Sequence, residues 1–401
     1  MALRRKHAAP DSDELAESLA LQGHVLVFGR GKLDEAGELL AQSLAIRAKR
    51  DPESAGTAQS LWYLGQWEGK MSRYDKAIEH QQKALSLRER LYGAGHPECL
   101  SVQEDIATNL RLAARLEEAE RMQRATLAAR EKLHGRNSEQ TLRQMVLLAR
   151  LVGERGRYRE SLALNQEGLG IAEKVNGPES LQYAVILNNI AFRQNRLGLT
   201  ADALANMEKV IRLYRKLYPA THPGRAVVEK NWGTTLLAAG RYEEAYAALQ
   251  TAYDLNLRVH GTQHHEPADV LVQTAIAAIE TGRLDDADAR LTQAKASPAM
   301  EKSAVLRAQQ LFATGLAEAK RGRIDAALAH LESAETSLAS SSPESQTVRW
   351  QIAARRAELL AARNQGDDRA KSRALAERFL APGGAPFDPE APIATRMRAL
   401  R

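Results

Sequence analysis

A short segment that reverses the chain recurs at a nearly fixed interval and organises the whole sequence. Its clearest copy is GRYEEA at residues 240–245. The copies end 40 to 42 residues apart, at Ala36, Ala77, Ala119, Ser161, Ala203, Ala245, Ala287 and Ala327. Such a period predicts a solenoid, in which each repeat buries its apolar face against its neighbours. The length of 401 residues, which otherwise suggests two or three globular domains, then requires only one array.

Each copy also predicts where two helices meet. Glycine adopts the left-handed backbone that ends a helix, and the acidic residues after it favour the positive end of the next helix. Helical patterns alternate with such breaks and no strand pattern occurs. The expected helix pairs are 12–29 with 33–49, 54–70 with 74–91, 98–113 with 117–133, 138–155 with 159–175, 179–196 with 200–217, 223–239 with 242–259, 267–281 with 284–296, 300–321 with 324–339, and 344–364 with 368–379.

These patterns divide the chain into four parts. We expect a basic N-terminal arm (1–11), an all-α solenoid of eight repeats (12–340), a capping helix pair (341–380) and a tail (381–401). The tail contains Pro382, Pro386, Pro389 and Pro392. This density of proline predicts a flexible segment that does not pack.

The net charge of +6 comes mainly from the two ends of the chain. Arg4, Arg5 and Lys6 contribute +3 and residues 381–401 contribute +1, which leaves +2 for the rest of the chain. Nucleic-acid binding is therefore not expected. No segment approaches the roughly 20 apolar residues that cross a bilayer, and one cysteine, Cys99, excludes an intrachain disulfide. We expect a soluble, cytoplasmic protein that does not associate with membranes.

Small residues at fixed offsets distinguish between helical repeat classes. The position twelve residues before each closing residue holds His24, Gly65, Ala107, Ala149, Ala191, Gly233, Ala275 and Gly315. The position seven residues after it is also mostly small, and a large apolar residue usually follows. We expect the two helices of each pair to approach closely at the small positions, a pattern that differs from HEAT-type arrays.

Three motifs connect the repeats to a known family. They are LNNIA at 187–191, LYGAGHP at 91–97 and YPATHP at 218–223, the last two lying three periods apart. Together with the GxYxEA turn, they resemble the kinesin-light-chain type of tetratricopeptide repeat, as found also in bacterial proteins. The resemblance covers about residues 12–340. It implies an all-α, right-handed superhelical solenoid of antiparallel helix pairs.

The resemblance also implies a binding groove, because the first helices of the pairs line a concave surface in this family. The groove residues that it implies here are Trp62, Tyr63, Arg143, Arg150, Asn188, Asn189, Phe192, Arg196, Lys230 and Asn231. Asn189 and Asn231 share one offset, at which relatives use asparagine to hydrogen-bond a ligand's backbone. Asp105 and Leu147 occupy that offset in repeats three and four, which confines the expected clamp to the middle repeats. The surrounding cations predict an acidic protein or peptide partner.

Other candidate sites have simpler explanations in the repeat pattern. His260, His264 and His265 cluster, but His264 corresponds to His222 one period earlier, so the repeated loop accounts for it. Arg47, Arg88 and Arg130 recur near the ends of second helices, where we expect them to favour the helix dipole and lie in solvent. No catalytic, phosphate-binding or metal-binding motif is apparent, so no enzyme activity and no cofactor are expected.

Two functions remain open. The first is a non-catalytic scaffold or adaptor that binds an extended peptide or partner segment in the groove. The second is a regulatory peptide receptor that controls a separate enzyme, such as a kinase or a protease. A peptide should suffice for a receptor and should change its shape, whereas an adaptor should hold a folded partner without a large change.

Overall fold

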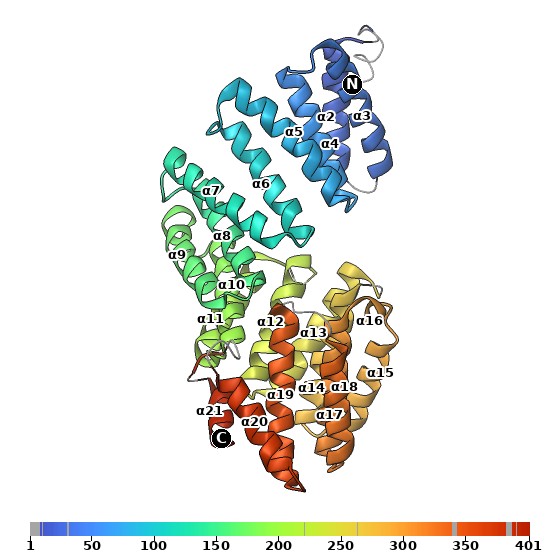
Figure 1. Ribbon diagram of the computed structural model, residues 1–401, viewed down its shortest axis with the longest axis vertical. Coiled ribbons are helices and arrows are strands. Elements are labelled where there is room, and N and C mark those ends of the chain that lie inside the picture. The colour runs from blue at the N-terminus through green and yellow to red at the C-terminus, as the bar shows by residue number, and fades with distance from the viewer. Residues whose placement is uncertain are drawn as a thin grey trace. The chain divides into compact units, whose positions relative to one another are not determined.

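The computed structural model describes residues 9, 11–29, 32–219, 221–262, 264–338, 343–381, 387–389 and 391–401, and these contain helices and no strand (Figure 1). Gly31 and the basic residues of the N-terminal arm lie outside them. The chain divides into two compact units, Met1–Leu151 and Val152–Arg401, called unit 1 and unit 2 below. None of the described helices is long and apolar enough to cross a membrane.

Unit 1 contains three complete helix pairs and the greater part of the first helix of a fourth. Its helices are α2 (Asp13–Phe28), α3 (Leu33–Arg50), α4 (Ala55–Lys70), α5 (Tyr74–Tyr92), α6 (Pro97–Leu112), α7 (Leu116–His134) and α8 (Glu139–Glu154), the last of which continues into unit 2. Ala58, Ile78 and Ile106 are among the buried side chains that join successive helices into one core.

Unit 2 continues the same alternation. Its helices are α9 (Tyr158–Asn176), α10 (Leu181–Leu197), α11 (Thr200–Leu217), α12 (Pro223–Ala238), α13 (Tyr242–His260), α14 (His265–Glu280), α15 (Leu284–Lys295), α16 (Ala299–Lys302), α17 (Ala304–Lys320), α18 (Ile324–Ser337), α19 (Pro343–Arg363), α20 (Asp368–Leu380) and α21 (Pro392–Ala399). The all-α architecture of repeated helix pairs is confirmed, and the expected boundaries are correct to about two residues. One expected helix, 300–321, is divided at Ser303, whose hydroxyl accepts a hydrogen bond from the backbone N–H of Leu306 and caps α17.

The turns within the second to eighth pairs adopt the predicted left-handed backbone. Gly240 has φ +74° and Gly282 has φ +79°. In two copies of the turn that have no glycine at this position, Ser72 and Ala114 adopt the same conformation with φ +59°. The conformation is therefore set by the repeat even where a side chain makes it unfavourable.

Close approach of paired helices occurs at the expected small positions, except in the first repeat. A Cβ atom on Gly233 would lie 2.5 Å from Cγ of Leu249, and one on Gly315 would lie 3.1 Å from Cγ of Leu331. In the first pair, Gly23 approaches Leu40, whereas His24 stacks on the Tyr63 ring at 4.0 Å. The close approach in the first pair lies one position before the offset of the later repeats, because four residues connect α2 to α3 whereas three connect α4 to α5.

The recurring arginines are buried, so the expectation of a solvent-exposed role was wrong. Arg47 and Arg88 are each only 4% exposed. Arg47 donates a hydrogen bond to the carbonyl oxygen of Gly56 at 2.9 Å, and Arg88 donates one to that of Glu98 at 2.9 Å. Each arginine thereby joins the second helix of its repeat to the first turn of the next repeat, since a backbone carbonyl oxygen has a second lone pair that can accept a side-chain donor.

The described part of the C-terminal segment is packed, which differs from the flexible tail expected from its prolines. Pro392 is the first residue of α21, a position that needs no backbone N–H. Ala391, Ala394 and Met397 are buried against α19 and α20. The backbone N–H of Asp388 also donates a hydrogen bond to the carbonyl oxygen of Leu197 at 2.7 Å.

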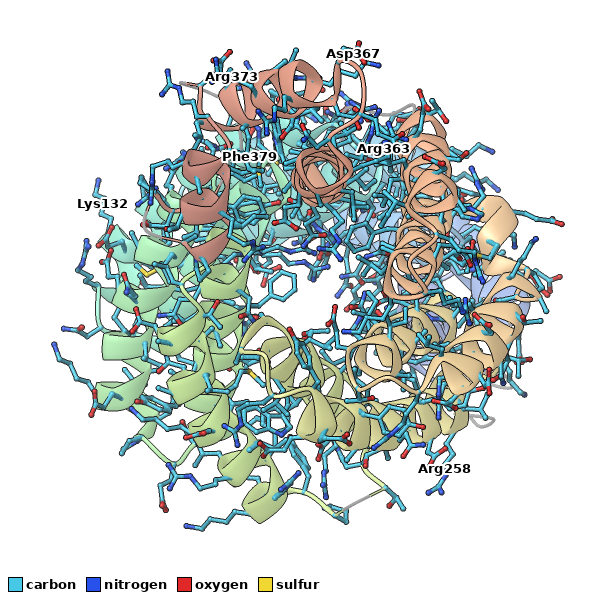
Figure 2. The ribbon with its side chains drawn as sticks, turned by 90° about the horizontal axis from the view of Figure 1, so that it is seen from below. Lys132, Arg258, Arg363, Asp367, Arg373 and Phe379 are labelled. Carbon is cyan, nitrogen blue, oxygen red and sulfur yellow. The ribbon has the colours of Figure 1, made fainter. Side chains whose placement is uncertain are left out.

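These contacts bring the last helices of unit 2 to its first helices. Arg159 on α9 pairs with Asp388 at 2.8 Å, and the hydroxyls of Tyr158 and Thr347 lie 3.2 Å apart. Gly198 lies so close to Ala391 that a Cβ atom on it would be 2.5 Å from the Ala391 Cβ. The helices of unit 2 consequently surround a central opening (Figure 2).

Candidate functional site

A cavity of about 670 Å³ lies within the ring of unit 2. The first helices of the pairs, α10, α12, α14, α17 and α19, supply most of its wall, and the rest comes from Tyr242, Ser303, Phe387 and α21. The first helices face inward because the small residues at the fixed offsets pack against the second helices. A volume of this size lies within the roughly 300–1,000 Å³ that is typical of ligand pockets.

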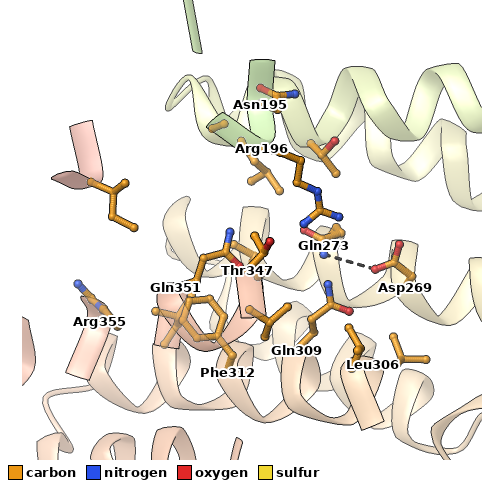
Figure 3. Close-up of a pocket in the computed structure, with 18 of the residues that line it drawn as sticks. Asn195, Arg196, Asp269, Gln273, Leu306, Gln309, Phe312, Thr347, Gln351 and Arg355 are labelled. Atoms are coloured by element: carbon orange, nitrogen blue, oxygen red, sulfur yellow. Dashed lines mark hydrogen bonds between the residues drawn. The ribbon is translucent and has the colours of Figure 1, made fainter. Parts of the chain in front are cut away.

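The wall combines apolar surfaces with side-chain amides. Phe192, Ile276, Leu306 and Phe312 contribute apolar groups. The amides come from five different helices and are Asn195, Asn231, Gln273, Gln309 and Gln351, most of which Figure 3 labels. Each amide offers a hydrogen-bond donor and an acceptor.

Some of these amide groups are already engaged within the protein. The side-chain amide of Asn231 donates to the side-chain oxygen Oδ1 of Asn188 at 3.1 Å. The side-chain amide of Gln273 donates to Asp269 at 3.4 Å (Figure 3). Asn195 donates to the Thr235 hydroxyl at 2.6 Å, while its own carbonyl oxygen is buried and accepts no hydrogen bond from the described residues. Unused acceptor and donor capacity therefore remains on this wall.

The cations of the wall are mostly neutralised by neighbouring carboxylates. Lys230 lies 2.5 Å from Glu266 and 3.3 Å from Asp269. Burial lowers the pKa of Lys230, but attraction to Asp269 and Glu266 exceeds that effect, so its pKa is raised overall and it stays charged. Lys230 therefore joins α12 to α14, and its expected contact with an acidic partner stays a prediction.

The predicted groove residues in unit 2 divide into two groups. Phe192, Arg196, Lys230 and Asn231 line the cavity. Asn188 and Asn189 do not, and both are half-buried. Asn188 acts on the wall indirectly, since its oxygen accepts the hydrogen bond that orients Asn231. The peptide-binding role of all six residues remains a prediction.

The predicted groove residues in unit 1 occupy a different setting. The indole N–H of Trp62 donates to Asp105 at 2.7 Å, and Tyr63 is buried beneath His24. Burial raises the pKa of Asp105, although hydrogen bonds from Gln66 and Trp62 oppose the shift. Arg143 and Arg150 on α8 are exposed.

Several wall residues were missed by sequence reasoning. Gln273 occupies the same repeat offset as Asn231, so an extension of the mapping to the seventh repeat would have found it. Gln309 lies on α17 of the eighth repeat, which the mapping also did not reach. Thr347, Gln351 and Arg355 on α19 reach the cavity only because unit 2 closes into a ring, and no local pattern signals that closure.

The histidine loop has a structural role. His264 accepts a hydrogen bond from the backbone N–H of Glu266 and caps α14, as His222 caps α12 and His96 caps α6. His260 stacks on His264 at 4.4 Å. Among the described residues, no group of three or more histidine, cysteine, aspartate or glutamate side chains is placed to hold a metal ion.

A family model for the tetratricopeptide repeat matches residues 14–79, 57–132, 105–174, 140–216 and 224–297, which together exceed half of the chain. The chain belongs to the tetratricopeptide repeat family. The helix pairs, turn glycines and close-approach positions described above are thus those of tetratricopeptide repeats. No curated protein matches the chain significantly.

Solved structures with the same fold include two Rap proteins. One, crystallised in complex with competence and sporulation factor, is 12% identical with a TM-score of 0.62, and the match covers 97% of this chain and 100% of that one. The apo form of RapI is 12% identical with a TM-score of 0.53, and the match covers 72% and 98%. A kinesin light chain protein of Podosopora anserina with nearly identical TPR-like repeats is 21% identical with a TM-score of 0.48, covering 53% and 99%.

Proposed function

We propose that unit 2 is a non-catalytic interaction module that binds a short, extended peptide in its central cavity. The observation that carries the proposal is the combination, in one cavity of about 670 Å³, of apolar side chains with amides from several helices. An extended peptide presents N–H and C=O groups in alternation and has no internal hydrogen bonds, so each of its groups needs a partner when it is buried. Side-chain amides supply both kinds of partner.

The geometry supports a short peptide over a large folded partner. Thr347 and Gln351 on α19 and Phe387 lie on the same cavity wall as Phe192 of α10. A ring leaves no broad open groove in unit 2 for a folded domain. One structural neighbour, a Rap protein, was crystallised with competence and sporulation factor, which makes ligand binding by this fold a reasonable starting point for the present chain.

The proposal is tested by affinity selection from a random pentapeptide library, read by mass spectrometry. The variant Gln309→Trp should fill the cavity, since Gln309 is half-buried on its wall. Gln250→Trp is the matched control, because Gln250 is exposed on α13 and does not line the cavity. The wild type and the control should retain a common set of peptides that Gln309→Trp loses. Retention of the same peptides by all three proteins would contradict binding in this cavity.

Small-angle scattering separates a regulatory receptor from an adaptor. If the chain is a receptor that controls a separate enzyme, the selected peptide alone should change the scattering profile, because only a shift between conformations can report binding. An unchanged profile with a saturating peptide would instead favour an adaptor that holds the segment of a larger partner.

A further inference from the structure

One cation on the cavity wall stands apart from the others. Lys230 pairs with Glu266 and Asp269, while Arg355 and Arg396 both pair with Glu358, at 3.0 and 2.8 Å. The remaining wall carboxylate, Glu280, lies 3.6 Å from Lys320. Arg196 has no carboxylate partner among the described residues. Lys230, Arg355 and Arg396 therefore each contact a wall carboxylate, whereas the guanidinium of Arg196 contacts none among the described residues.

The position of Arg196 suits it to receive a ligand group. It lies in the last turn of α10 and extends into the cavity toward Gln273 (Figure 3). Its guanidinium carbon is 5.0 Å from the centre of the Phe192 ring, one helical turn earlier. Contact with the aromatic ring limits the freedom of the side chain and leaves the N–H groups at the edge of the guanidinium plane available. Such a planar fork binds a carboxylate through two parallel hydrogen bonds.

We infer that the peptide bound in this cavity carries a single carboxylate, which Arg196 receives. This inference rests on the proposed function and adds the charge of the ligand to it. A carboxylate removed from water requires a cation to offset the loss of hydration, and Arg196 is the wall cation whose charge no described carboxylate already neutralises. Its apolar neighbours on the wall, Phe192 and Ile276, strengthen the attraction by excluding water.

The same charges argue against a strongly acidic ligand. A second carboxylate in the cavity would meet Lys230, Arg355 or Arg396 only beside the carboxylates that already pair with them. At Lys230 it would face repulsion from Glu266 and Asp269, and at Arg355 and Arg396 it would compete with Glu358 for the two guanidinium groups. The sequence predicts an acidic partner, and the structure restricts this prediction to a ligand with one carboxylate, which lies beside Arg196.

The carboxylate can come from an acidic side chain or from the C-terminus of the peptide, and two libraries distinguish these sources. Both contain N-acetylated pentapeptides, one with free C-termini and the other with C-terminal amides. Enrichment of peptides without Asp or Glu from the free-acid library, but not from the amide library, identifies a C-terminal carboxylate. Enrichment of peptides with one Asp or Glu from the amide library identifies a side chain.

The decisive comparison is between wild type, Arg196→Gln, Arg196→Glu and the control Arg258→Gln. Arg258 is exposed and points away from the central opening (Figure 2). The preference for one carboxylate should fall roughly tenfold or more in Arg196→Gln, should shift toward Lys- or Arg-containing peptides in Arg196→Glu, and should persist in Arg258→Gln. Neutral peptides should be retained equally by wild type and Arg196→Gln.

Two results overturn the inference while leaving peptide binding intact. In one, wild type retains peptides without any charge preference. In the other, the preference for a carboxylate survives Arg196→Gln. If wild type retains no peptide from either library, the proposed function fails, and the inference fails with it.

Discussion

At the scale of the residue, Gly233 marks a point at which α12 and α13 approach each other closely. A methyl group at this position would lie 2.5 Å from Leu249 Cγ, so Gly233→Ala forces the buried leucine to move. We expect a loss of about 1–3 kcal/mol in the free energy of unfolding, measured by urea denaturation of unit 2. Gly170→Ala is the control, because Gly170 is helical and meets open space. It should stabilise by up to about 1 kcal/mol through helix propensity. Equal stability of Gly233→Ala and wild type would show that the helices can separate without cost.

Asp105 is a second residue whose setting makes a definite prediction. Its pKa is raised by burial, so the folded state binds a proton more readily than the unfolded state does. The ionised form therefore costs stability, and this cost appears as pH rises through the folded pKa. Asp105→Asn should raise the urea midpoint of unit 1 at pH 7. Its amide can still accept from Trp62 and Gln66, and the buried oxygen Oε1 of Gln66 has no donor among the described residues.

The pH dependence of this difference provides the check. As pH falls toward and below the raised pKa, the urea midpoint of wild type should rise relative to that of Asp105→Asn, because the carboxyl of Asp105 becomes neutral. Asp75→Asn serves as the control, since the Asp75 side chain is 89% exposed. Its urea midpoint should follow that of wild type at every pH. A constant difference between Asp105→Asn and wild type over the acidic range would mean that Asp105 does not titrate there.

At the scale of the element, Arg88 shows how one helix pair is held to the next. It stacks on Trp62 at 4.4 Å, pairs with Glu98 at 3.1 Å and donates to the Glu98 carbonyl oxygen. Arg88→Met keeps an apolar chain but leaves that oxygen without its donor. We expect a loss of about 1–3 kcal/mol in unit 1, measured by urea denaturation. Arg90 lies on the same helix as Arg88 and forms an exposed ion pair with Glu53. Arg90→Met removes this pair and should lower the free energy of unfolding by less than about 1 kcal/mol. Similar effects of the two variants would contradict a structural role for the buried arginine.

The elements themselves could be predicted because their signals are local. The turn glycines, first-turn acids and prolines mark each helix boundary within a few residues of it. Arg88 could not be placed from the same signals, since its burial depends on the next repeat. The sequence of α21 also contains a local signal for a helix, but the prolines around it predict a flexible segment instead. Ile393, Met397 and Leu400 recur at helical spacing directly after Pro392, which is a favourable first residue of a helix.

At the scale of the whole molecule, the binding cavity depends on contacts that the repeat period does not encode. The family resemblance implies that the first helices line a concave surface, and four of the groove residues that it implies, Phe192, Arg196, Lys230 and Asn231, line the cavity. It does not predict how far the array curves. The approach of Asp388 to Leu197 joins positions far apart in the sequence, and the pairing of Lys230 with α14 cancels a charge that appears free in the sequence.

Closure of unit 2 can be tested at Met397 on α21. Its side chain is fully buried against the helices α19 and α20. Met397→Ala removes most of this side chain, and the resulting cavity should cost about 2–5 kcal/mol of local stability. We expect the segment 387–399 to detach more often, so that its amides, including the Asp388 N–H bonded to Leu197, exchange faster with deuterium. Exchange in α2–α7 should not change, because the C-terminal segment belongs to unit 2. Arg401→Ala is the control, since Arg401 is exposed at the end of the chain. If these amides already exchange at the rate of an unfolded chain in wild type, the segment does not close the ring, and the cavity should then admit partners larger than a short peptide.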